Sequence, residues 1–203
     1  MTPEKKKYKA STGVDEFTYA PLDETGENTI IGTPQRVEFL QNITVEMPQE
    51  PVRAYGDNKT AEIAVSSGNT SVTSGFHKVP EQDKQALFGL EKSEDGIYAY
   101  GSTDTPPYVA VMFAKTYEDG SKEYAGLPKG MFMRPNIEGQ TKQDGVEFSS
   151  EEITAEFMDR KVEGFEEEKT VIFGRDDKGS TTARDAVYKA VFGVPHPEAK
   201  PTP

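Results

Sequence analysis

Short apolar runs, many of them alternating with polar residues, recur along the chain and are bounded by glycine, proline, asparagine or aspartate. This spacing is typical of the strands of a β-sandwich or barrel. No period of 20–50 residues repeats, which argues against a solenoid or a propeller. The strands predicted in this way are Phe17–Ala20, Arg36–Glu46, Ala61–Ser66, Thr70–Phe76, Ile97–Tyr100, Tyr108–Tyr117, Lys122–Leu127, Gly130–Met133, Ile153–Met158 and Thr170–Phe173.

The clearest local pattern is a hairpin between Tyr108 and Leu127. Asp119 and Gly120 at its centre favour a two-residue type I′ turn, which needs positive φ angles. The strand before the turn contains Val109–Phe113, which is apolar at consecutive rather than alternate positions. Such a strand is buried on both faces, either inside the domain or against a neighbouring subunit.

Two helices are predicted among these strands. The first, Pro80–Phe88, has proline and acidic residues in its first turn and Gly89 as its stop. The second, Ala183–Phe192, follows a capping pattern made by Thr182 with Asp185. Their apolar stripes are most simply the faces that pack on a sheet.

These elements predict one mainly β domain over residues 14–193, a β-sandwich or barrel-like fold with a flanking α-helix and a C-terminal helix. Residues 1–13 are expected to form a flexible N-terminal arm, and residues 194–203 a disordered C-terminal tail. Met47–Gly68 resists assignment, because it carries two prolines and a Gly-Asp-Asn turn before an apolar run. A connection of this length is usually functional or mobile, so we expect it to project from the domain; an ordinary floppy insertion is the alternative.

The composition shows that the chain is poor in apolar residues and has no cysteine thiols. Hydrophobic residues make up 34% of the 203 residues, so part of the stability is expected to come from association. The absence of cysteine excludes disulfides and thiolate zinc sites. The charged N-terminus does not resemble a signal peptide, and no stretch approaches the ~18 apolar residues of a membrane span. We therefore expect synthesis in a cytoplasm and no membrane partner.

The net charge of −12 argues against specific DNA or RNA binding, because such a surface repels phosphates. Nine acidic and two basic residues lie between Glu147 and Glu168. This stretch is either a solvated face or an acidic surface past which something must slide. The candidate residues for that surface are Glu151, Glu156, Glu163, Glu166, Glu167 and Glu168.

No catalytic, cofactor or metal residue is assigned. His77 and His196 are the only histidines, and neither has a partner motif for nucleophilic catalysis or metal binding. No glycine-rich phosphate loop occurs. The many carboxylates leave a two-carboxylate glycosidase as the enzyme alternative, but such sites usually add aromatic sugar platforms and this chain has no tryptophan.

Four segments carry a resemblance to a known family: Ala54–Gly68, Phe76–Glu91, Tyr98–Phe113 and Glu156–Phe173. They resemble the major tail tube proteins of long-tailed, non-contractile (siphovirus-type) bacteriophages, in particular those of Gram-positive hosts. The resemblance extends from about Val14 to Phe192.

This resemblance implies a structural protein of the virion tail. Such proteins assemble as hexameric rings that stack into a hollow tube, which houses the tape measure protein, conducts DNA without binding it specifically, and meets tail terminator and distal tail proteins at its ends. A long loop and the terminal arms commonly bridge successive rings. By order along the chain, Met47–Gly68 is that loop, and Met1–Thr12 and Val194–Pro203 are the arms. The alternative is a phage head decoration protein or another virion β-domain protein. The loop residues expected to act in assembly are Met47, Pro48, Pro51, Arg53, Tyr55, Asp57, Asn58 and Lys59.

Overall fold

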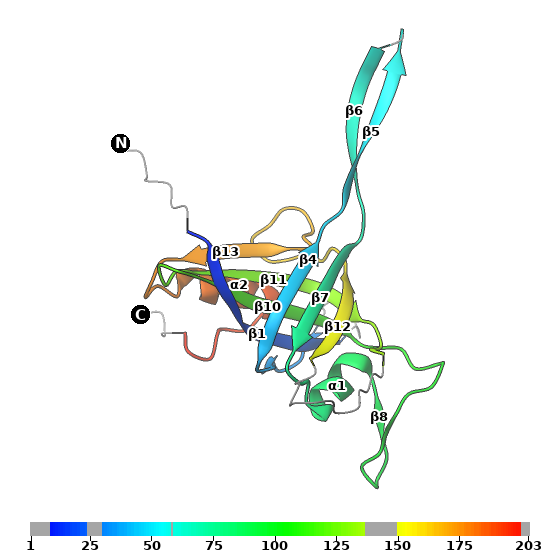
Figure 1. Cartoon of the computed structure of the whole chain (residues 1–203), viewed down its shortest axis with the longest axis vertical. Helices are drawn as coiled ribbons and strands as arrows, with labels where there is room; N and C mark the ends of the chain where they lie inside the picture. Colours follow the sequence, from blue (N-terminus) through cyan, green and yellow to red (C-terminus); the bar gives the residue numbers. More distant parts are fainter. Residues whose placement is uncertain (1–8, 24–29, 58, 137–149, 200–203) are drawn as a thin grey trace, which may run out of the picture.

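A computed structural model describes residues 9–23, 30–57, 59–136 and 150–199 and confirms a mainly β fold with two helices (Figure 1). The helices are α1 (Glu81–Phe88) and α2 (Thr182–Phe192). The strands are β1 (Ser11–Asp23), β2 (Ile30–Ile31), β3 (Gln35–Arg36), β4 (Leu40–Glu46), β5 (Gln49–Gly56), β6 (Lys59–Ser67), β7 (Thr70–Phe76), β8 (Glu91–Lys92), β9 (Tyr98–Ala99), β10 (Tyr108–Tyr117), β11 (Lys122–Phe132), β12 (Glu151–Phe157) and β13 (Ile172–Asp176).

The main sheet is antiparallel and has the strand order β2-β1-β10-β11-β12-β7-β4. It divides at β11, whose first half pairs with β13 and whose last residues pair with β12. The two parts fold over one another as a sandwich that is not closed into a barrel. Their inward side chains form a first core, whose largest fully buried members are Phe17, Tyr19, Phe76, Phe88, Phe113 and Phe132.

Strand β10 is buried on both faces, as its consecutive apolar residues predict. Val109, Val111 and Phe113 enter the first core. The alternate side chains, Ala110 and Met112 among them, enter a second core on the other face of the sheet. Because α2 of the same chain covers this second core, the alternative that a neighbouring subunit buries this strand is wrong.

Helix α2 packs very close to the sheet. A Cβ added to Gly126 on β11 would lie 2.3 Å from Cγ2 of Val191, so glycine is required where the helix crosses the strand. The predicted cap of this helix is wrong, because the helix begins at Thr182 and its N-cap residue Thr181 makes no side-chain cap hydrogen bond. The first turn is capped from a distance by Asp176.

The carboxylate of Asp176 lies at the end of β13 and accepts the backbone N–H groups of Ala183 (3.0 Å) and Arg184 (2.9 Å). It also accepts the hydroxyl of Ser180 (2.8 Å). Burial alone would raise the pKa of Asp176, but these hydrogen bonds and the charge of Arg184 outweigh it and lower the pKa below its usual value. The last strand and the last helix are therefore joined by one buried charge.

Helix α1 agrees with its prediction. It follows Pro80 and ends at Gly89, which adopts the left-handed conformation with φ 66°. Leu87 and Phe88 close the first core. The buried hydroxyl of Tyr19 donates to Asp83 Oδ1 at 2.8 Å, and burial together with this carboxylate raises the pKa of Tyr19.

The β10–β11 hairpin forms as predicted, but its turn type was wrong. Gly120 has φ 79°, whereas Asp119 is not among the residues with positive φ. Gly120 N–H donates to Tyr117 O and Tyr117 N–H to Ser121 O, which makes a three-residue loop with glycine at the left-handed position. The two strands predicted after the turn, Lys122–Leu127 and Gly130–Met133, form the single strand β11. Pro128 lies at the bulge where β11 changes its pairing partner, so its missing N–H group removes no hydrogen bond of the sheet.

Both terminal predictions need correction where the structure describes them. Residues 11–13, expected in the flexible arm, belong to β1, and Ser11 is paired with Tyr117. Residues 194–199, expected in a disordered tail, pack on α2: Arg184 bonds to Glu198 at 2.8 Å and the His196 ring lies 4.7 Å from that of Tyr188. Residues 1–8 and 200–203 lie outside the described residues.

Candidate functional site

The segment that the sequence left unassigned, residues 47–68, is a β-hairpin. Strands β5 and β6 form a two-stranded sheet of their own. They follow directly from β4 and lead directly into β7, and Gly68 N–H donates to Pro48 O (2.9 Å) at the base. Figure 1 shows the hairpin standing away from the sandwich at one end of the long axis of the molecule.

The two faces of this hairpin differ in chemistry. Pro51 pairs with Val65, and Arg53 with Ile63; side chains of paired residues share a face. Together with Tyr55 they form what we call the apolar face of the hairpin, which is Pro51, Arg53, Tyr55, Ile63 and Val65. The opposite face has Val52 and Ala54 but also both strand carboxylates, Glu50 and Glu62.

The apolar side chains of the hairpin are largely exposed, since no other described part of the chain covers them. Tyr55 is 71% exposed, Val65 62% and Ile63 60%. An isolated two-stranded hairpin is at best marginally stable in water, and a contiguous exposed apolar surface usually marks an interaction site. The hairpin therefore has the properties of a docking element.

The predicted loop residues all belong to this hairpin, apart from Asn58, which lies outside the described residues. Met47 and Pro48 precede β5, Asp57 stands at the turn with φ 47°, and Lys59 begins β6. Only Pro51, Arg53 and Tyr55 of the set contribute to the apolar face. Sequence reasoning missed Ile63 and Val65, although their alternation with polar residues was visible.

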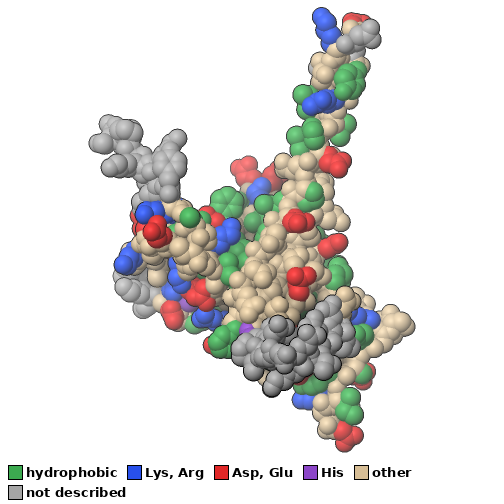
Figure 2. All heavy atoms as spheres, viewed as in Figure 1, with side chains coloured by type: hydrophobic (Ala, Val, Ile, Leu, Met, Phe, Trp, Pro, Cys, Tyr) green, Lys and Arg blue, Asp and Glu red, His purple; other side chains and the backbone are tan. Residues whose placement is uncertain are grey.

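A second candidate surface is the outward face of β4, β7 and β12, which we call the polar face. None of these strands contains lysine or arginine. Figure 2 shows acidic side chains and no basic ones over β4 and β7. The inward side chains of the same strands enter the first core. By register, the polar face consists of Asn42, Thr44, Glu46, Ser71, Thr73, Gly75, Glu152, Thr154 and Glu156.

Of the predicted acidic residues, only Glu156 lies on the polar face. Glu151 has a structural role instead: its carboxylate accepts the Val79 N–H (3.1 Å) and bonds to Lys84 Nζ (3.2 Å), which ties α1 to β12. Glu46 and Glu152 were missed, although alternation along β4 and β12 places them on the outward side.

The remaining predicted carboxylates lie on the loop between β12 and β13. Arg160 anchors the base of this loop by donating to the backbone oxygens of Pro128 and Val191, each at 2.8 Å, and its burial lowers its pKa. Val162 is buried in the second core. The exposed carboxylates that this base supports are Glu163, Glu166, Glu167 and Glu168.

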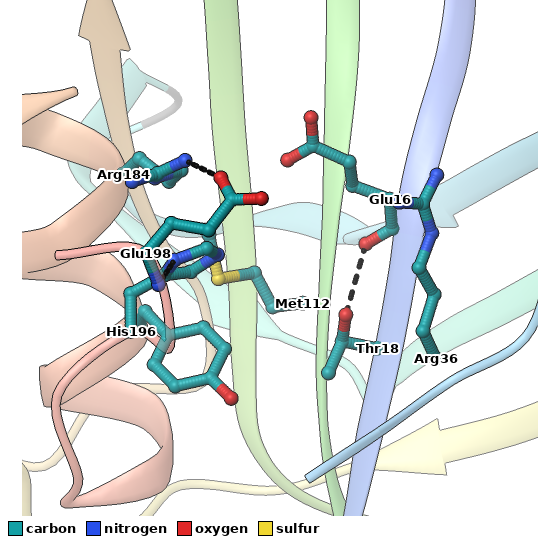
Figure 3. A pocket seen from close by; sticks show the side chains of 8 residues that line it. Glu16, Thr18, Arg36, Met112, Arg184, His196 and Glu198 are labelled. Atoms are coloured by element: carbon teal, nitrogen blue, oxygen red, sulfur yellow. Dashed lines mark hydrogen bonds and ion pairs between the residues drawn. The ribbon is translucent and has the colours of Figure 1, made fainter.

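A shallow pocket lies between β1 and the C-terminal segment (Figure 3). Its charged side chains already have partners: Arg184 donates to Glu198 and Asp185, Arg36 donates to Asp15, and Glu16 accepts from Lys122. His196 lines this pocket, and burial and the charge of Arg184 lower its pKa, whereas His77 lies beside Phe39. The structure therefore does not bring the two histidines together, and the described residues contain no group of acidic and histidine side chains that could hold a metal ion.

A family model described as phage tail tube protein matches residues 39–198, which include the hairpin, the polar face and both helices. No match was found among curated proteins. Within the part of the chain that the structure describes, no helix is long and apolar enough to cross a membrane.

Proposed function

Because the chain belongs to the phage tail tube protein family, structural proteins of the virion tail, we propose that it polymerises as hexameric rings that stack into the tail tube. We extend this to the tails of long, non-contractile phages of Gram-positive hosts. The observation that carries the proposal beyond the family is the β5–β6 hairpin, whose apolar face is exposed in the single chain. Stacking would bury it, and residues 47–68 would then be the bridge between rings.

The polar face is the surface that we assign to the lumen. Its carboxylates Glu46, Glu152 and Glu156 are not balanced by any basic residue on its three strands. Six copies carry six times −12, or −72 formal charges, before screening. A wall of this sign lowers the adhesion of DNA. In this proposal the lumen first houses the tape measure protein, and DNA later slides through it without specific binding.

Free strand edges favour closure of the ring by neighbouring copies. Within the described residues β4 is paired on one side only, with β7, and β13 on one side only, with β11. Phe173 on β13 is 74% exposed. Such edges promote pairing with another chain, and a head-to-tail arrangement closes as a ring. In this proposal the chain has no catalytic role, and tail terminator and distal tail proteins bind the two ends of the tube.

Negative-stain electron microscopy of the purified chain tests the assembly. Hollow tubes or six-fold rings support it. A monomer or trimer that persists at high concentration with tail initiator components contradicts it and favours a head decoration protein.

Deletion of residues 54–60 tests the hairpin. Because none of the described residues among them belongs to either core, the variant should keep the circular dichroism spectrum and melting temperature of the unmodified chain. It should form no tubes. A matched control, Glu62→Gln on the opposite face of the hairpin, should form tubes normally. Normal tubes from the deletion variant would refute the bridging role.

A further inference from the structure

A second, smaller arm projects from the opposite end of the molecule. Strands β8 and β9 pair as a short hairpin, with Glu91 opposite Ala99 and Lys92 opposite Tyr98. Figure 1 shows this β8–β9 arm at the far end of the long axis from the β5–β6 hairpin. Its tip is closed by a backbone hydrogen bond, in which Ser93 N–H donates to Ile97 O at 2.9 Å.

The tip of the β8–β9 arm is acidic and apolar. Glu94 and Asp95 are exposed there, and Ile97 is 65% exposed. The only cation of the arm, Lys92, lies over the ring of Tyr98 at 5.3 Å, at the base of the turn. The tip therefore presents two carboxylates beside one uncovered aliphatic side chain.

The apolar face of the β5–β6 hairpin is the chemical complement of this tip. Arg53 is its only charged residue, and Tyr55 and Ile63 flank it. The opposite face carries the carboxylates Glu50 and Glu62 and one cation, Lys59, so its net charge is negative and it would repel an acidic partner. Charge thus selects which face of the hairpin can meet Glu94 and Asp95.

We propose that the apolar face of the β5–β6 hairpin docks on the β8–β9 arm of a copy in the next ring. This docking rests on the proposed function. Two complementary arms at opposite ends of one chain make a head-to-tail contact that repeats without closing, as stacking along a tube requires. The proposed contact places the long axis of each copy along the tube. Copies within one ring then hold like arms at the same level, so the contact joins rings rather than ring neighbours. Ile97 packs against Tyr55 and Ile63, and Arg53 pairs with Glu94 or Asp95.

Cross-linking tests this contact directly, since the chain has no cysteine of its own. Ile63→Cys and Ile97→Cys are made in separately tagged chains and co-assembled as minor fractions with excess unmodified chain, so that tubes still form. An added oxidant then joins two thiols only where the Cα atoms approach within about 7 Å. We expect a disulfide-linked dimer carrying both tags in tubes and not in unassembled chains.

The matched control is Val52→Cys, on the opposite face of the hairpin, paired with Ile97→Cys. Its dimer yield should be about tenfold lower, because strand side chains on opposite faces point away from one another. Equal yields from the two pairs overturn the docking.

Charge reversal gives an independent test. Arg53→Glu and Asp95→Lys should each raise the chain concentration needed for tube formation about tenfold, and their combination should restore much of the loss. Glu62→Lys, on the opposite face, should leave that concentration unchanged. A combined variant no better than the single ones overturns the docking. An unmodified chain that forms no tubes contradicts the proposed function itself, whereas tubes with neither cross-link nor rescue contradict only this contact.

Discussion

The β10–β11 and β5–β6 hairpins are built alike and buried in opposite ways. Both are antiparallel pairs closed by a tight turn, and both contain alternating or continuous apolar residues. In β10, Val109–Ala114 are buried on both faces by the first core and by α2. In β5 and β6, Tyr55, Ile63 and Val65 remain more than half exposed.

The difference shows where each hairpin obtains its stability. The β10–β11 hairpin is stabilised by burial within one chain, so it folds without a partner. The β5–β6 hairpin has only its own ladder and needs a second surface to bury its apolar face. One chain thus separates the part that folds from the part that assembles.

The largest effect is expected from truncating one aromatic side chain in each hairpin. Phe113→Ala removes a ring that is 1% exposed and should lower the free energy of unfolding by about 3–5 kcal/mol. Tyr55→Ala should change it by less than about 0.5 kcal/mol, because Tyr55 is exposed, yet should abolish tubes. Urea denaturation and electron microscopy measure the two quantities. Equal loss of stability in both variants would contradict the separation of folding from assembly.

An intermediate effect is expected at Asp176. Its carboxylate caps α2, and α2 covers the buried β10–β11 hairpin but not the exposed β5–β6 hairpin. Asp176→Ala should lower the free energy of unfolding by about 1–2 kcal/mol, as for other lost helix caps. The folded-state pKa of Asp176 is depressed, so its stabilisation is fully present above the unfolded pKa near ~3.9 and is lost as pH falls through the folded value.

The difference in stability between Asp176→Ala and the unmodified chain should therefore be constant near neutral pH and shrink in acid. Urea denaturation across that range measures it. Asp177→Ala, one residue further on and exposed, serves as the control and should cost less. A difference that grows as the pH falls would show that Asp176 does not cap α2 as a carboxylate.

The smallest effect is expected at Ser74, on the strand that follows the exposed hairpin. Its hydroxyl is buried and has no hydrogen-bond partner within the described residues. Ser74→Ala should leave the melting temperature unchanged or raise it slightly, corresponding to at most about 1 kcal/mol. Thr73→Ala on the outward side of β7 is the matched control. A clear loss of stability in Ser74→Ala alone would mean that the hydroxyl is satisfied in solution.

Local patterns predicted much of the fold. Alternation and turn residues located most strands, and proline, acidic residues and Gly89 delimited α1, because these signals act over a few residues. The cap of α2 could not be found in this way, since Asp176 lies outside the helix and reaches it through a turn. The turn at Gly120 was misassigned because Asp-Gly suits both a two-residue and a three-residue loop.

The candidate surfaces were predicted only in part, because local patterns do not show which distant strands and helices meet. The density of acidic residues along the sequence singled out Glu151 and Glu156 together, but Glu151 bonds to Lys84 on α1 and Glu156 faces outward. The polar face exists only when β4, β7 and β12 are aligned, and these strands are far apart in the chain.

The sequence by itself determined that Val109–Phe113 would be buried on both faces and that residues 47–68 would differ from the rest. The first conclusion follows from the run of consecutive apolar residues, and the second from the prolines, the Gly-Asp-Asn turn and the length of the connection, all of which are local properties of the chain. Only the tertiary structure decided what covers each apolar side chain. Helix α2 lies some seventy residues after β10 in the sequence and covers it, while no described element covers the apolar face of the hairpin. Burial depends on long-range packing, and this packing leaves one hairpin in the core and the other exposed for a partner.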